Sequence, residues 1–241
     1  MKLIPTIIQS GNTATIFQDT IQSHQIIVEE GAQLNLIAVH HTVPDFENSF
    51  TQHIELHDRA VVRIFTGLFN SVHYSCNSLL LGHHAVFEHF ILYFAHAKQH
   101  LDVQTCAQHT AIDTMSRTIV HGIALDQTHV QYTGSIQIEP SAKRTDSLLS
   151  HEGLLLGKQA RIDALPGFNI HTNAVKARHN SAVHALRPDQ LFYMQTRGVT
   201  EQKAKQLIVR GFIEEMIHSI QSHSIRHDVQ MILEKKQHLI S

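Results

Sequence analysis

The hydrophobic and polar positions of this chain follow one recurring template along most of its length. An aliphatic residue is followed by three mostly polar residues, then by a small or polar residue that is usually alanine, and then by alternating positions. The polar triplet is typical of a tight turn, and the alternation is typical of a strand with one buried face. The template begins at Val28, Leu56, Leu81, Val103, Leu125, Ile138, Leu156 and Ile170.

This repetition predicts a parallel β-helix. A single strand–turn unit cannot bury its own apolar face, so stacked neighbours must stabilise it. The irregular spacing of the units disfavours the strict six-residue period of hexapeptide helices. An antiparallel sandwich with similar turns is the alternative. We expect stacked parallel coils from about residue 25 to residue 185, with alanines at comparable turn-to-strand positions: Ala32, Ala60, Ala85, Ala107, Ala142, Ala160 and Ala174.

The pattern changes to helical spacing after Arg197–Gly198. Apolar residues from Ala204 to Ile220 fall on one stripe, and Thr200 is placed to cap the start of this helix. A second apolar stripe predicts another helix and is formed by Ile225, Val229, Ile232 and Leu239. We therefore expect a β-helix core over residues 1–197 and a helical segment over residues 198–241. The apolar stripes are expected to pack against the solenoid or against each other.

Composition and charge exclude several classes of function. The chain has 19 basic and 21 acidic side chains, so it has no charge surplus for binding nucleic acid or an anionic membrane. Its start has neither a signal peptide nor about 20 consecutive apolar residues, which predicts a cytoplasmic protein. Cys76 and Cys106 are the only cysteines, and they cannot supply the four thiolates that an iron–sulfur cluster normally takes.

Histidine is the unusual residue, with 22 copies among 241 residues. We interpret most of them as residues of solvated strand faces and turns, because they are scattered along the chain. His223 and His227 would share one face of a helix and are the best-spaced pair for a metal, although the sequence shows no third ligand. A rival interpretation is a His-rich β-solenoid metal-binding protein or metalloenzyme with a surface site built from His83, His84 and His109.

The C-terminal third of the chain contains ordered motifs that are similar to those of a known family. The stretch resembles the core of the SufB/SufD family of iron–sulfur cluster assembly proteins. That family's pattern is an L-L-L run, a short turn, A, P-x-[LF]-x-I, a strand ending in [VL]-x-x-x-H, then [DE]-Q-L-F-Y and R-G-[IV] before a helix. The matching residues are Leu154–Leu156, Ala160, Pro166, Ile170, Val175, His179, Asp189–Tyr193 and Arg197–Val199.

The resemblance implies a right-handed parallel β-helix followed by a short helical segment. It also implies a non-enzymatic scaffold subunit with no intrinsic cofactor, holding iron or an iron–sulfur cluster transiently if at all. Such a subunit would pair through its β-helix with a SufB-like protomer or a second copy, and would dock a SufC-type ATPase through its helices. The docking residues that it implies are Phe192, Tyr193, Arg197, Gly198, Leu207 and Phe212. The Phe192–Tyr193 turn is expected to pack the end of the solenoid.

The departures from the family pattern place the match on the SufD side. Cluster-building SufB members carry a cysteine at the position of Ala160 and a carboxylate at the position of Asn180. SufD-type members commonly carry a cysteine at the position of Ala177. Family members usually carry an N-terminal helical region, whereas this sequence opens in a strand-like stretch, so we expect a trimmed version of the family. His179 alone carries over as a candidate ligand for iron or a cluster, because a neutral imidazole can bind iron and relay protons near pH 7.

Overall fold

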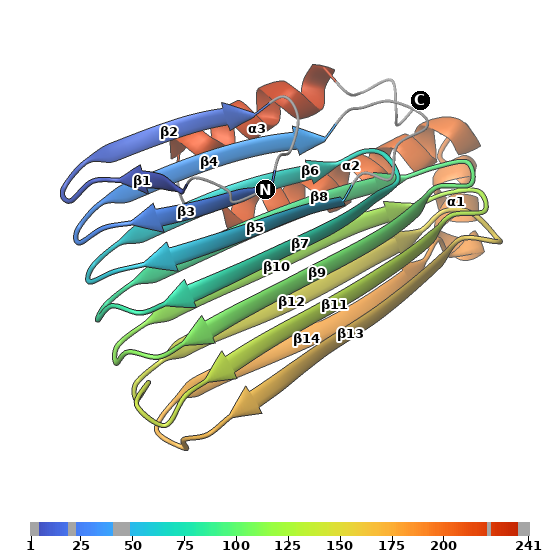
Figure 1. The fold of residues 1–241 in the computed structure, drawn as a ribbon. Helices are drawn as coiled ribbons and strands as arrows, with labels where there is room; N and C mark the ends of the chain where they lie inside the picture. Colours follow the sequence, from blue (N-terminus) through green and yellow to red (C-terminus); the bar gives the residue numbers. More distant parts are fainter. Residues whose placement is uncertain (1–4, 19–22, 41–48, 221–222, 236–241) are drawn as a thin grey trace.

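The computed structural model describes residues 5–18, 23–40, 49–220 and 223–235, and these form a parallel β-solenoid with helices along one side (Figure 1). Successive strands alternate between two parallel sheets of seven strands each. In spatial order, one sheet contains β1 (Thr6–Ile8), β3 (His24–Val28), β5 (Ser49–Leu56), β7 (Val72–Leu80), β9 (His100–His109), β11 (His129–Ile138) and β13 (Arg161–Ile170). The other contains β2 (Thr13–Gln18), β4 (Gln33–His40), β6 (Val61–Leu68), β8 (Val86–Ala95), β10 (Met115–Ala124), β12 (Asp146–Leu155) and β14 (Lys176–Ala185).

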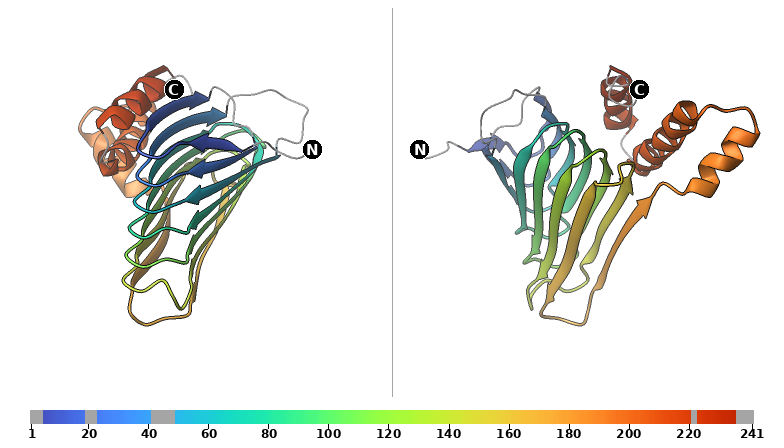
Figure 2. Two further views of the ribbon diagram at one scale, coloured as in Figure 1. Left: turned by 60° about the vertical axis from the view of Figure 1, so that its left-hand side comes forward. Right: turned by 90° about the vertical axis from the view of Figure 1, so that its right-hand side faces the viewer.

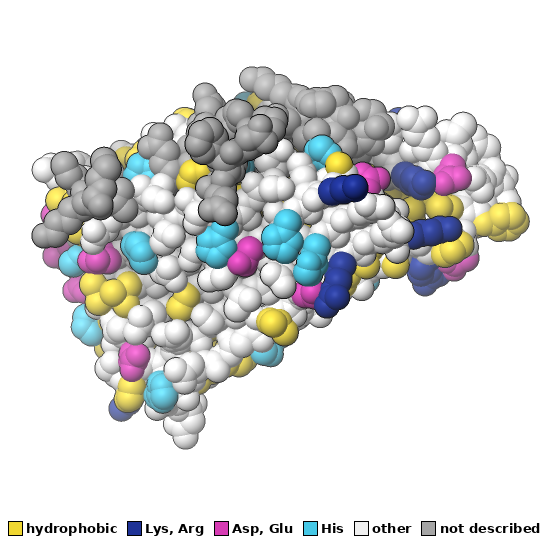
Figure 3. All heavy atoms as spheres, turned by 45° about the vertical axis from the view of Figure 1, so that its right-hand side comes forward, with side chains coloured by type: hydrophobic (Ala, Val, Ile, Leu, Met, Phe, Trp, Pro, Cys, Tyr) yellow, Lys and Arg dark blue, Asp and Glu magenta, His cyan; other side chains and the backbone are white. Residues whose placement is uncertain are grey.

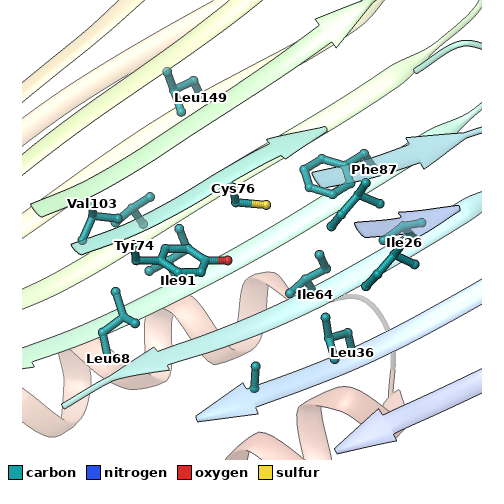
Figure 4. Close-up of a cluster of buried hydrophobic side chains, with 14 of the residues drawn as sticks. Ile26, Leu36, Ile64, Leu68, Tyr74, Cys76, Phe87, Ile91, Val103 and Leu149 are labelled. Atoms are coloured by element: carbon teal, nitrogen blue, oxygen red, sulfur yellow. The ribbon is translucent and has the colours of Figure 1, made fainter. Parts of the chain in front are cut away.

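The strand pairing confirms the predicted parallel β-helix and rules out the antiparallel sandwich. Each strand pairs in parallel with strands two places away in the chain, so every coil contributes one strand to each sheet. Alternate side chains point between the sheets, as strand geometry requires. They form a continuous apolar core that includes Ile64, Tyr74, Ile91 and Leu149 (Figure 4).

The turns that lead from the first sheet to the second explain part of the alanine pattern. The residues directly before β4, β6 and β8 are Ala32, Ala60 and Ala85, respectively, and all three are fully buried. The Val61 backbone N–H donates to the Ala32 carbonyl at 2.9 Å, and the Val86 N–H donates to the Ala60 carbonyl at 2.9 Å. The stack of turns therefore leaves space only for small side chains at these positions.

The alanine template was wrong at four positions. Ala107 lies inside β9, and Thr114 takes the buried position before β10 instead. Ala142 is buried in the next such turn, but Thr145 is the buried residue directly before β12. Ala160 precedes β13, so it lies at the opposite end of the coils from Ala32. Ala174 is exposed. A threonine can replace alanine in the stack because its hydroxyl bonds back to its own turn, as Thr114 does to the Ala111 carbonyl at 3.2 Å.

Three helices follow the last strand, one more than the sequence predicted. They are α1 (Pro188–Thr196), α2 (Glu201–Ser219) and α3 (His223–Lys235). The last strand ends at Ala185, so the helical part begins ten residues before the expected boundary at residue 198. The stretch around Phe192 and Tyr193 is helical because Pro188 favours the first turn of a helix. No helix in the described part of the chain is long and apolar enough to cross a membrane.

Helices α2 and α3 pack on the outer face of the sheet formed by the even-numbered strands (Figure 2). This face contributes Phe65, Phe90 and Ile123 to a second apolar core, and the helices contribute Met216 and Val229. Strands under the helices are buried on both faces, which is why β8 is apolar at almost every position. The predicted packing of the apolar stripes against the solenoid is confirmed where the side chains are described; Leu239 and the side chains of Ile225 and Ile232 lie outside that part.

Three of the fully buried histidines in the described residues lie between the two sheets and bond to hydroxyl groups. His89 Nε2 lies 3.0 Å from Thr66 Oγ1, and His151 Nε2 lies 3.0 Å from Tyr93 Oη. The two ring nitrogens of His109 lie within 2.9 Å of the hydroxyls of Thr114 and Ser116. Burial lowers the pKa of His89 to about 3 and the pKa values of His109 and His151 to about 4. Part of the histidine excess is therefore structural.

These histidines predict a loss of stability in mild acid. Their folded-state pKa values lie below the value of about 6.5 in an unfolded chain, so the unfolded state binds more protons once the pH falls below that value. Lowering the pH from 7.5 to 5.0 should reduce the free energy of unfolding by ~2 kcal/mol for each of the three. Urea unfolding at the two pH values measures this, and His109→Gln should shrink the pH-dependent fall by about one third. Equal stability at both pH values would contradict the prediction.

Candidate functional site at the open end of the solenoid

The C-terminal end of the solenoid is not covered by another coil. β13 pairs only with β11, and β14 pairs only with β12, among the strands of the described residues. Inward-facing side chains are therefore exposed at this end. Phe168 is 40% exposed, whereas Ile136, its register partner in the preceding coil, is buried. The last coil thus presents two unpaired strand edges and a partly apolar interior.

His179 lies on β14 at this open end. It is in register with Leu149, whose side chain belongs to the core between the sheets, so the imidazole points inward rather than toward the outer face. Its ring stacks on the ring of Phe168, with centroids 4.2 Å apart and planes inclined by 14°. No hydrogen bond reaches either ring nitrogen from the residues that the structure describes.

The contrast with His151 shows what is particular about His179. His151 is buried one coil earlier, and its two nitrogens lie near the hydroxyls of Tyr93 and Ser181. His179 is exposed, one face of its ring stacks on Phe168, and its nitrogens accept no hydrogen bond from the described residues. A ring in that state can accept a metal ion or a proton donor at its edge, because the lone pair of a neutral imidazole lies in the ring plane.

The other motif positions bring no thiolate or carboxylate to this end. Ala160 is half-buried against the solenoid core, in the turn before β13. Ala177 points inward on β14, whereas Asn180 points to the outer face because it neighbours His179 along the strand. Among these motif positions, His179 is therefore the one whose side chain offers an atom that commonly binds iron, an imidazole nitrogen.

The residues predicted to dock an ATPase lie in the helical part of the chain, apart from the open end of the solenoid. Phe192 and Tyr193 on α1 are 67% and 60% exposed, so the expectation that they pack the end of the solenoid is wrong (Figure 2). The Arg197 guanidinium lies 5.4 Å from the centre of the Tyr193 ring. Leu207 on α2 is also exposed, whereas Phe212 is half-buried and contacts His121 on β10, with ring centroids 4.8 Å apart.

The Arg197–Gly198 step ends α1 and allows α2 to start. Gly198 adopts a left-handed conformation, with φ at +83°. Its N–H donates to the Gln195 carbonyl, and the Val199 N–H donates to the Met194 carbonyl, which together form a Schellman motif. Thr200 then caps α2, because its hydroxyl accepts from the Lys203 N–H at 3.3 Å. The cap predicted from the sequence is confirmed.

The predicted histidine metal sites remain without a complete ligand set. His223 and His227 are exposed on α3, and no group of three His, Cys, Asp or Glu side chains suited to a metal occurs within the described ranges. The surface row of His83, His84 and His109 is not formed, because His109 points into the core while the other two lie exposed in a turn. The histidines on the face shown in Figure 3 are spread out. Some histidines of the described residues pair with carboxylates, as His129 does with Asp163.

The two cysteines do not form a site together. Cys76 is buried inside the solenoid, where burial raises the pKa of its thiol to about 12. Cys106 is half-buried on the neighbouring strand and is in register with Asn77, so it points to the outer face. The two thiols thus lie on opposite sides of one sheet.

Comparison with known proteins gives a consistent set of matches. A family model described as SUF system FeS cluster assembly, SufBD core domain, matches residues 6–212. An iron–sulfur cluster assembly SufBD family protein of Mycobacterium leprae (strain TN) is 30% identical over 212 residues, which cover 84% of this chain and 54% of that protein. The iron–sulfur cluster assembly protein SufD of Escherichia coli (strain K12) is 23% identical over 231 residues, or 91% of this chain and 55% of that protein. The chain spans about half the length of these relatives.

Proposed function

Because this chain belongs to the SufBD family of iron–sulfur cluster assembly proteins, we propose that it is a non-enzymatic scaffold subunit that acts in the cytoplasm. It pairs through the open end of its solenoid with a SufB-like protomer or a second copy, and it docks a SufC-type ATPase through its helices. The observation that carries the proposal is the position of His179, an exposed residue on an unpaired edge strand whose ring nitrogens are not hydrogen-bonded by the described residues.

The lengths of the edge strands support pairing at this end. β13 and β14 have ten residues each, whereas β1 and β2 at the other end have three and six. Proteins commonly protect sheet edges by keeping edge strands short, and a long edge with exposed apolar residues is a template for another strand. Leu165, Phe168 and Val183 are such residues here. The last coil would bury its interior when a second solenoid adds its own edge strands.

A lysine at the open end should weaken pairing. Val183→Lys places a charge among the inward side chains of β14, and the dissociation constant of the paired state should rise at least ten-fold, which corresponds to about 1.4 kcal/mol. Phe17→Lys on β2 is the control, because Phe17 is an exposed apolar residue on the opposite edge of the same sheet, where it faces the outer side in register with Ile37. Sedimentation equilibrium with the SufB-like partner, and with the chain alone, measures both. Equal effects of the two lysines would contradict pairing at this end.

His179 is proposed to contact iron or a cluster in transit at the paired end. Its position among exposed inward residues places it where two solenoids would meet, and its unbonded nitrogens match the requirements of a ligand. The thiols do not match these requirements. Cys76 is buried with a raised pKa, and Cys106 lies in the same sheet but faces outward.

Replacing His179 should impair cluster maturation without unfolding the protein. His179→Ala should leave the free energy of unfolding within ~1 kcal/mol of wild type, because the side chain is exposed. It should nevertheless fail to complement a cluster-assembly defect. The Cys76→Ser and Cys106→Ser double variant should complement far better, and melting temperatures separate loss of function from loss of stability. Failure of the stable cysteine variant with full function of His179→Ala would reverse the assignment.

The ATPase is proposed to dock on α1 and on the exposed side of α2. Phe192, Tyr193 and Leu207 are large apolar residues that water would otherwise surround, and aromatic residues are enriched at the centres of interfaces. α2 also covers the outer face of the even-numbered strands, so deleting it would expose Phe65 and Phe90. Point substitutions on α1 therefore test docking more cleanly than truncation.

Removing the two aromatic side chains of α1 should abolish capture of the ATPase. Phe192→Ser together with Tyr193→Ser should weaken binding of a purified SufC-type ATPase at least ten-fold, since truncating an aromatic at an interface centre commonly costs more than about 2 kcal/mol. Met231→Ser on α3 is the control, because Met231 is also exposed. Calorimetry measures the affinities. Unchanged binding by the double variant would place the docking site elsewhere.

A further inference from the structure

We propose that Phe168 is a positioning residue that orients the imidazole of His179 for an iron ion or cluster at the open end of the solenoid. The inference rests on the proposed function of His179 and adds a second residue to it. The stack between the two rings is the observation from which it starts, and no other described side chain holds the His179 ring through a ring contact or a hydrogen bond.

The two residues come from different sheets. Phe168 belongs to β13 and His179 to β14, so the stack joins the edge strands of the two sheets across the interior of the last coil. Phe168 is directed inward by its register with Ile136, and His179 by its register with Leu149. In the coils before, such positions are held by packing on both sides. At the open end, each ring has mainly the other to pack on.

The geometry of the stack selects the direction from which a ligand can approach. With planes inclined by only 14°, the phenyl ring covers one face of the imidazole and leaves its edge uncovered. Metal ions and hydrogen-bond donors approach a neutral imidazole in the ring plane. The stack therefore restricts rotation of an otherwise exposed side chain while leaving its nitrogens accessible, and prior restriction of this kind lowers the entropic cost of binding.

The chemistry of Phe168 suits this role better than that of an aliphatic residue. A flat ring can hold another flat ring parallel to itself, whereas a branched aliphatic side chain fills space without fixing an orientation.

The experiment compares five variants in complementation of a cluster-assembly defect. Phe168→Leu keeps an apolar side chain but removes the flat ring, and it should lower cluster maturation about ten-fold, the size of effect that residues supporting a ligand typically have. Phe168→Tyr keeps the ring and should mature clusters as well as the wild type does. Combining Phe168→Leu with His179→Ala should be no worse than His179→Ala alone, because the two residues act as a unit. Phe17→Leu on the opposite edge is the matched control and should have no effect.

Nuclear magnetic resonance shows independently of maturation whether the stack forms in solution. In the wild type, the ring protons of His179 should be shifted upfield by the phenyl ring, and Phe168→Leu should remove the shift while the melting temperature changes little. Full maturation by Phe168→Leu with the upfield shift lost would overturn the positioning role while leaving His179 as a ligand. Full maturation by His179→Ala would overturn both. An absent upfield shift in the wild type would show that the stack does not form in solution.

Discussion

Every coil of the solenoid buries its inward side chains because other coils lie beside it. The stacked strands satisfy one another's backbone groups, and the turn residues before the even-numbered strands continue the same hydrogen-bonded ladder. This dependence ends at β13 and β14, where inward side chains such as Phe168 and Val183 are left partly exposed. The site proposed here is therefore a consequence of how the fold is built, because the last coil keeps the interior side chains of a coil without a neighbour to bury them.

The same constraint explains where the helices lie. The sheet of even-numbered strands would expose an apolar outer face, and α2 and α3 bury it through residues such as Met216 and Val229. Because one side of α2 and α3 packs on the sheet, α1 and the other side of α2 remain available to bind a partner. Phe192 and Tyr193 lie on α1 without any buried residue beside them in that helix. Pairing and docking are thus proposed for two different surfaces of one rigid scaffold.

Much of this architecture could be predicted from the sequence because the solenoid repeats one local rule. The alternation at the start of strands such as β4 and the cap at Thr200 depend on neighbouring residues alone, and both were predicted correctly. The family resemblance was also confirmed. The error at Ala107 arose because a strand residue and a turn residue can share the same polar flanks. Whether Phe192 is buried or exposed depends on tertiary packing, which no local pattern records.

The role of Phe168 could not be predicted from spacing. Its inward direction follows from the alternation of β13, but its contact with His179 depends on the distance between two sheets that are joined through a turn. The sequence did indicate that both residues belong to the last coil, which is a condition for their contact. Stacked strands make such contacts predictable only once the register is known, and the register here is set by the turn lengths.

The central claim is that the open end of the solenoid is the surface at which this subunit works, and amide hydrogen exchange measures that most directly. In the isolated chain, the amides of β13 and β14 should exchange faster than those of β9 and β10, because their outer edges are unpaired. Adding the SufB-like protomer should slow exchange in β13 and β14 and leave β1 and β2 unchanged. Protection confined to β1 and β2, or to the outer faces of the sheets, would show that the partner binds elsewhere and would contradict the account.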